Sequence, residues 1–88
     1  MYHQERQLQQ LRLRFSNWLP YLRMATKAEV EILPAGTGNA FIVKATWRDG
    51  EHSKAYDAAH ILRLGYVSCV KDYARAFVKE VLEKRGVL

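Results

Sequence analysis

Few side chains in this sequence have the spacing of a catalytic or metal-binding site. The histidines His3, His52 and His60 have no His or Cys partner at the short spacings of a zinc site, and Cys69 lies nine residues beyond His60. A thiol–imidazole pair has no local support, because a lone cysteine near a helix start is typically a small buried apolar residue. We therefore expect no metal site, no cofactor and no catalytic residue.

Other polar pairs have simpler structural interpretations. Asp57 and His60 are three residues apart, which fits a helix cap beside a surface histidine. The segment 36–38 resembles a phosphate-binding loop only in having two glycines. It is not followed by Gly-Lys-Ser/Thr or by an expected helix, so we expect it to connect two strands of a hairpin. Glu29 and Glu31 fall on one side of an expected strand, outside any enclosed pocket. The sequence therefore predicts a protein that is not an enzyme.

Charge is the strongest functional signal. The formal net charge is +5, and residues 1–27 hold five Lys or Arg against one acid, whereas residues 28–57 hold three against five and residues 58–88 six against three. The expected helices are thus basic and the expected strands acidic, which disfavours RNA binding on an aromatic, positive sheet. A polyanion would instead contact the helices, and the candidate residues for phosphate contacts are Lys71, Arg75, Lys79, Arg12 and Arg23.

Two functions remain after these exclusions. The sequence favours a small non-enzymatic nucleic-acid-binding or nucleic-acid-associated protein that contacts DNA or RNA through basic helical surfaces. The alternative is a protein-binding adaptor or inhibitor module that occupies a surface of a larger macromolecular complex. A continuous Arg/Lys stripe would favour the polyanion, and exposed Trp, Tyr and Arg would favour the protein partner. The basic residues could also be only the solvated faces of helices.

The first element that must position these charges is a helix over about residues 4–18. Its apolar positions recur at steps of three and four, which places on one stripe Leu8, Leu11, Phe15, Trp18 and Leu22. Pro20 lacks an N–H, and its ring would clash with the carbonyl of Ser16. We therefore expect the helix to stop or kink near residues 17–19, with a short helical turn over 20–25.

Three strands follow, over about residues 28–33, 40–48 and 51–57, where the apolar period changes to two. Asp49-Gly50 predicts a two-residue type I′ hairpin turn with positive φ at both positions. This turn would set the pairs Arg48–Glu51, Trp47–His52, Ala45–Lys54 and Val43–Tyr56. The predicted core face carries Phe41, Val43, Trp47 and Tyr56, and the predicted solvent face carries Lys44, Thr46, Arg48, Glu51 and Ser53.

The C-terminal region, about residues 58–85, is expected to be helical, although residues 58–67 fit either a helix or a loop. Ser68 could cap a last helix with a stripe of Val70, Tyr73, Phe77 and Val81, ended by Gly86. The chain therefore predicts an α+β fold, a single domain over 1–88 with α-β-β-β-α order, in which an antiparallel three-stranded sheet packs against helices.

Length and composition limit the setting. With 88 residues and 49% hydrophobic content, the chain can fold, but its core will be thin. A homodimer through the first helix or a sheet edge is therefore a possible partner arrangement. A lone cysteine, no apolar run long enough to span a bilayer and no apolar signal region near residue 1 favour a cytoplasmic location and no membrane partner.

Two resemblances point toward nucleic acid without identifying a family. The α-β-β-β-α order and the size are similar to those of the double-stranded-RNA-binding domain, but residues 36–39 lack that family's loop histidine and residues 67–71 lack its Lys-Lys-x-x-Lys. The segment Ala55-Tyr56-Asp57-Ala58-Ala59 resembles the helix of AP2-type DNA-binding domains. That resemblance would place Tyr56 in a helix and leave no room for the third strand.

Overall fold

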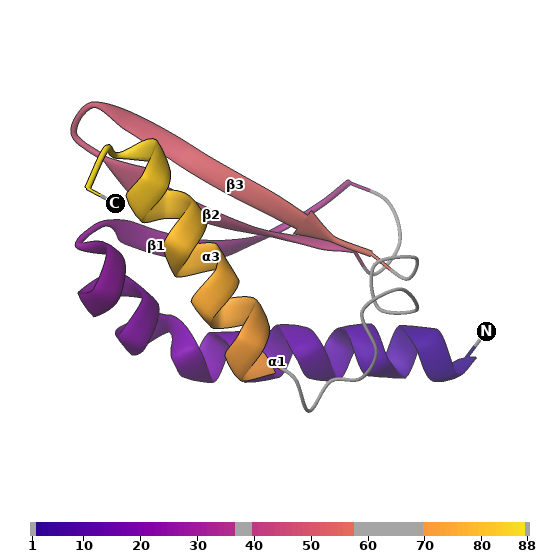
Figure 1. Cartoon of the computed structure of the whole chain (residues 1–88). Coiled ribbons are helices and arrows are strands. Elements are labelled where there is room, and N and C mark those ends of the chain that lie inside the picture. The colour runs from indigo at the N-terminus through magenta and orange to yellow at the C-terminus, as the bar shows by residue number, and fades with distance from the viewer. Residues whose placement is uncertain (1, 37–39, 58–69, 88) are drawn as a thin grey trace.

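The computed structural model describes residues 2–36, 40–57 and 70–87, and it has the expected α+β class and element order (Figure 1). The elements are α1 (Tyr2–Thr26), β1 (Glu29–Pro34), β2 (Phe41–Trp47), β3 (Gly50–Tyr56) and α3 (Val70–Lys84). Each strand lies within one residue of its expected range. Residues 58–67, which fit either a helix or a loop, and Ser68, the expected cap of the last helix, lie outside the described residues.

Helix α1 differs from the prediction because it continues through Pro20 to Thr26. Of the two outcomes expected near residues 17–19, a stop or a kink, the stop is wrong, and so is the separate helical turn over 20–25. Leu22 and Thr26, both beyond the proline, are fully buried, and the Thr26 hydroxyl donates to the Leu22 carbonyl at 2.6 Å. Burial of this last part outweighs the local cost of an interior proline, and the helix bends on its way to β1 (Figure 1).

The sheet is an antiparallel meander in the order β1-β2-β3. Trp47 pairs with Gly50, so the two turn residues are Arg48 and Asp49. Neither has positive φ, so the predicted type I′ turn at Asp49-Gly50 is wrong. Gly50 instead accommodates the indole of Trp47, whose ring atoms would lie 3.2–3.3 Å from an added Cβ.

The register of the hairpin is shifted by two residues from the predicted one. The observed pairs are Phe41–Tyr56, Val43–Lys54 and Ala45–His52. Because side chains alternate with a period of two, a shift of two changes the partners but leaves every side chain on its expected face. Phe41, Val43 and Tyr56 are accordingly buried and Trp47 is partly buried, as predicted.

Both helices pack on this same face of the sheet. The ring of Phe15 in α1 lies 6.1 Å from that of Phe41 and 5.1 Å from that of Tyr56, and the Tyr56 ring lies 6.0 Å from that of Tyr73 in α3. The core also contains the predicted helical residues Leu8, Leu11, Leu22, Val70, Phe77 and Val81, with Trp18 packed at its edge. The apolar stripe of α1 is thus used inside the chain, and the homodimer stays a prediction.

Helix α3 ends as predicted. Gly86 has φ of +75°, its N–H donates to the Glu83 carbonyl at 3.0 Å, and the Val87 N–H donates to the Leu82 carbonyl at 2.9 Å. These two bonds form a Schellman motif, which favours glycine at the left-handed position. No helix among the described residues is both long and apolar enough to cross a membrane.

Candidate polyanion interface

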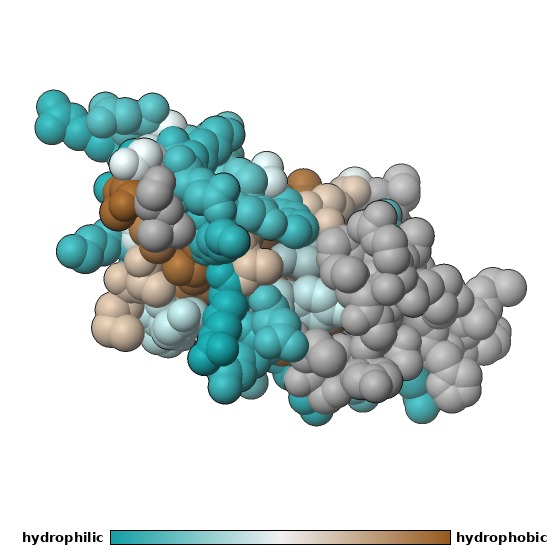
Figure 2. Space-filling view, in the orientation of Figure 1, coloured by the Kyte–Doolittle hydropathy of each residue, from teal (hydrophilic) through white to brown (hydrophobic). Residues whose placement is uncertain are grey.

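Three of the predicted contact residues form an exposed row on α3. Lys71, Arg75 and Lys79 are four residues apart, about one helical turn, and all three are exposed. Within the described part of the chain, none of them forms an ion pair. In Figure 2 hydrophilic side chains cover much of the surface that lies over α3, with some apolar side chains between them. We call these three residues the α3 row.

The two predicted residues on α1 lie elsewhere. Arg23 donates from Nε and Nη2 to the carbonyl of Val30 at 3.2 and 3.1 Å, so its guanidinium holds α1 against β1. Arg12 is exposed and lies eleven residues, about three turns, before Arg23, so the two share a flank of α1. Arg23 contacts β1, which is the sheet edge opposite β3, and α3 packs against β3. The five predicted residues therefore do not form one surface.

Sequence reasoning did not select the other arginines of α1. Arg6 and Arg14 are both exposed, and Arg14 lies on the other side of the helix from Arg12, since two residues turn the helix by about 200°. A simple signal was present, because residues 6–28 contain no Asp or Glu. The burial of the α1 stripe also removes self-association through that stripe as a reason to prefer α3 over α1.

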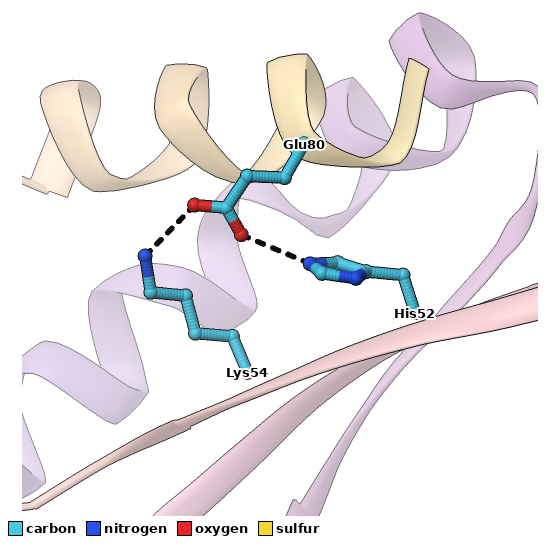
Figure 3. A network of polar contacts seen from close by, with 3 residues as sticks. All are labelled: His52, Lys54 and Glu80. Carbon is cyan, nitrogen blue, oxygen red and sulfur yellow. Dashed lines mark hydrogen bonds and ion pairs between the residues drawn. The ribbon is translucent and has the colours of Figure 1, made fainter. Parts of the chain in front are cut away.

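The α3 row is oriented by a polar network between α3 and β3 (Figure 3). Glu80 accepts hydrogen bonds from the Lys54 ammonium and the His52 ring, each at 2.9 Å, and the His52 ring also lies 5.6 Å from that of Phe77. Desolvation acts to raise the pKa of Glu80, but the hydrogen bonds and charges of Lys54 and His52 lower it below its ordinary value. The network joins α3 to β3 beside the buried core residues of the helix.

The same environment keeps a nearby phenol neutral. Burial raises the pKa of Tyr56 far above its ordinary value, and the carboxylate of Glu80 and the phenol of Tyr73 raise it further. Tyr56 lies in β3, so the AP2-type resemblance, which would place it in a helix, is wrong for this position. The Tyr56 side chain is therefore part of the core.

The open face of the sheet is acidic, as the charge pattern predicted. Glu29, Glu31 and Glu51 are exposed there, and the only lysine among the described residues of that face, Lys44, forms an ion pair with Glu51 at 3.1 Å. The carboxylates at the centre of this face are unfavourable for a phosphate backbone, whereas Arg48 lies at the β2–β3 turn. The geometry thus separates a basic helical layer from an acidic sheet face.

No group of three or more His, Cys, Asp or Glu side chains within residues 2–36, 40–57 and 70–87 could hold a metal ion. His60 and Cys69 lie outside the described residues, so their pairings, and that of Asp57 with His60, stay untested.

Comparison with protein-family models, curated proteins and solved structures finds no match to this chain.

Proposed function

We propose that this protein is a cytoplasmic, non-enzymatic nucleic-acid-binding protein whose helical layer contacts the phosphate backbone of DNA or RNA. The observation that supports it most is the α3 row, in which three exposed cations are spaced one per turn on a helix fixed to the sheet by the Glu80 network. The exposed Arg6, Arg12 and Arg14 of α1 lie in the stretch 6–28, which contains no Asp or Glu, and they add to the net positive charge of the helical layer without joining the α3 row.

Binding of this kind has a specific salt dependence. Each phosphate that a cation neutralises releases counterions, so the logarithm of the affinity falls with the logarithm of salt concentration by about 0.9 per neutralised phosphate on duplex DNA. No base-reading motif is evident in the α3 row, so sequence preference should be weak. Binding should therefore be strong only at low salt and similar on unrelated sequences.

The test is fluorescence anisotropy with labelled duplex and single-stranded DNA and RNA over a series of salt concentrations. Replacing Lys71, Arg75 and Lys79 by Gln should weaken binding and lower the salt slope on duplex DNA by about 0.9 for each phosphate that is no longer neutralised. The Lys44→Gln variant is the control, because Lys44 lies on the acidic face, and it should leave the slope unchanged. Absence of binding to all four nucleic acids at low salt would exclude the proposal.

A protein partner is the second candidate function, supported by exposed apolar side chains and not by aromatic ones. Leu13 and Met24 are 66% and 72% exposed, and with exposed Pro20 they follow one ridge of α1. Such apolar side chains cannot bind phosphates, so they favour a protein partner. The aromatic side chains of the core do not add to this surface, because they are buried or partly buried. If nucleic acids do not bind, a Leu13→Gln/Met24→Gln variant that loses binding to a candidate partner, with an unchanged melting temperature, would support this function.

A further inference from the structure

A second group of cations lines a pocket at the end of the molecule where the last residues of α1 and α3 meet the β2–β3 turn (Figure 1). The pocket is open to solvent and has a volume of about 570 Å³. Its polar and aromatic lining consists of Lys27, Glu29, Thr46, Trp47, Arg48 and Arg85. Three cations thus face one carboxylate, which leaves an excess of positive charge in the pocket.

Arg85 is held in place by contacts that leave much of its guanidinium available. Its Nη1 donates to the carbonyl oxygens of Thr26, the last residue of α1, and of Lys27, which follows it. The guanidinium carbon also lies 5.7 Å from the ring centroid of Trp47. The N–H groups on Nε and Nη2 are not used by these contacts, so a preorganised donor pair remains for an acceptor.

Lys27 occupies a backbone position that normally favours glycine. It follows α1 with φ of +54°, and its N–H donates to the Arg23 carbonyl at 2.9 Å, which closes the helix. The equivalent position after α3 is Gly86, with φ of +75°. A lysine is thus retained in a conformation that disfavours side chains, and it lines the pocket together with Arg48 and Arg85.

We propose that this pocket binds a phosphate group, whether free, carried by a nucleotide or at the end of a nucleic-acid strand. Arg48 and Arg85 offer guanidinium donors suited to phosphate oxygens, and Lys27 adds a compact positive charge. Trp47 acts by positioning Arg85. The proposal does not depend on the helical interface, because the pocket contains no residue of the α3 row.

The experiment is a titration of the full chain followed by two-dimensional ¹H–¹⁵N NMR, with the indole N–H of Trp47 as the reporter. The additions are inorganic phosphate, adenosine monophosphate, adenosine, and one short oligonucleotide with and without a 5′-phosphate. Shifts with phosphate and adenosine monophosphate but not with adenosine would support the site. An equal response to adenosine would indicate base stacking and overturn the proposal, as would no shift with any phosphate-bearing probe. The oligonucleotide pair then distinguishes a strand end from a free nucleotide.

Variants separate binding from folding. Lys27→Gly should raise the melting temperature, because glycine accepts positive φ, yet weaken phosphate binding by about tenfold through the lost ammonium. Arg48→Gln should weaken binding similarly without changing the melting temperature. Lys44→Gln removes the same charge on the open face of the sheet, outside both the pocket and the proposed helical interface, and should bind phosphate like the original chain. If Lys27→Gly and Arg48→Gln both bind as tightly as Lys44→Gln, the pocket is not a phosphate site.

Discussion

Replacement of Glu80 by Gln tests whether the network between α3 and β3 stabilises the fold. Gln keeps the size of the side chain but removes its charge, so it can no longer accept two charge-assisted hydrogen bonds from Lys54 and His52. Hydrogen bonds to charged groups contribute about 1.5–3 kcal/mol each. The Glu80 side chain is 34% exposed, so solvent screens the interaction, and the expected loss is about 1–2 kcal/mol in all at pH 7.

The pH dependence of this loss has a definite sign. The pKa of Glu80 in the folded protein lies below its ordinary value of 4.5, so the carboxylate adds stability above that value. This stability is lost as the pH falls through the lowered folded pKa. The free energies of unfolding of the original chain and of Glu80→Gln should therefore differ most near neutral pH and converge in acid.

The assay is urea unfolding at several pH values, with the loss of structure monitored by circular dichroism. A loss of about 1–2 kcal/mol should lower the melting temperature by roughly 5–10 °C in a domain of this size. Glu83→Gln is the matched control, because it removes the same negative charge from an exposed position of the same helix. Equal free energies of unfolding for Glu80→Gln and Glu83→Gln at neutral pH, with the same pH profile, would contradict a stabilising role for the network.

Three further substitutions test the packing. Phe77→Ala removes a fully buried ring and should lower the free energy of unfolding by about 3–5 kcal/mol. Cooperative melting of this variant at an unchanged temperature would contradict the position of Phe77 in the core. Gly50→Ala brings a Cβ to 3.2 Å from the indole of Trp47, at a φ that alanine can adopt. The substitution should lower the free energy of unfolding by about 1 kcal/mol in urea. An unchanged urea midpoint would mean that the indole moves aside freely. Pro20→Ala restores an N–H toward the carbonyl of Ser16 within a continuous helix and should raise the melting temperature in thermal unfolding. A decrease would mean that the proline itself is required for the packing of the last part of α1.

Local patterns determined most of the fold. The period of two placed Phe41, Val43 and Tyr56 on one face, and the period near 3.6 placed Leu11, Phe15 and Phe77 in the core, because burial depends on which side of an element a residue occupies. The predicted faces of β2 and β3 are correct even though the predicted register is wrong, because a shift of two residues leaves each side chain on the same face of the sheet. Gly86 marked a helix end because its requirement for positive φ is local.

At Pro20 and Gly50, tertiary packing outweighed the local preference that the sequence indicated. Pro20 is unfavourable within a helix, but the burial of Leu22 and Thr26 keeps the helix intact, and the sequence does not state how much burial lies beyond the proline. Gly50 was interpreted as a turn residue, whereas its lack of a side chain serves the ring of Trp47.

The polar sites depend on the tertiary structure to the greatest extent. Glu80 meets Lys54 from 26 residues away, and Arg85 reaches the carbonyl of Lys27 from 58 residues away, so no spacing rule along the chain could pair them. Charge along the sequence indicated that the helices are basic, and the exposure of the α3 row agrees with this. Only the packing of α1 on β1 showed that Arg23 is used internally, because a charged side chain has the same sequence signature whether it contacts solvent or backbone.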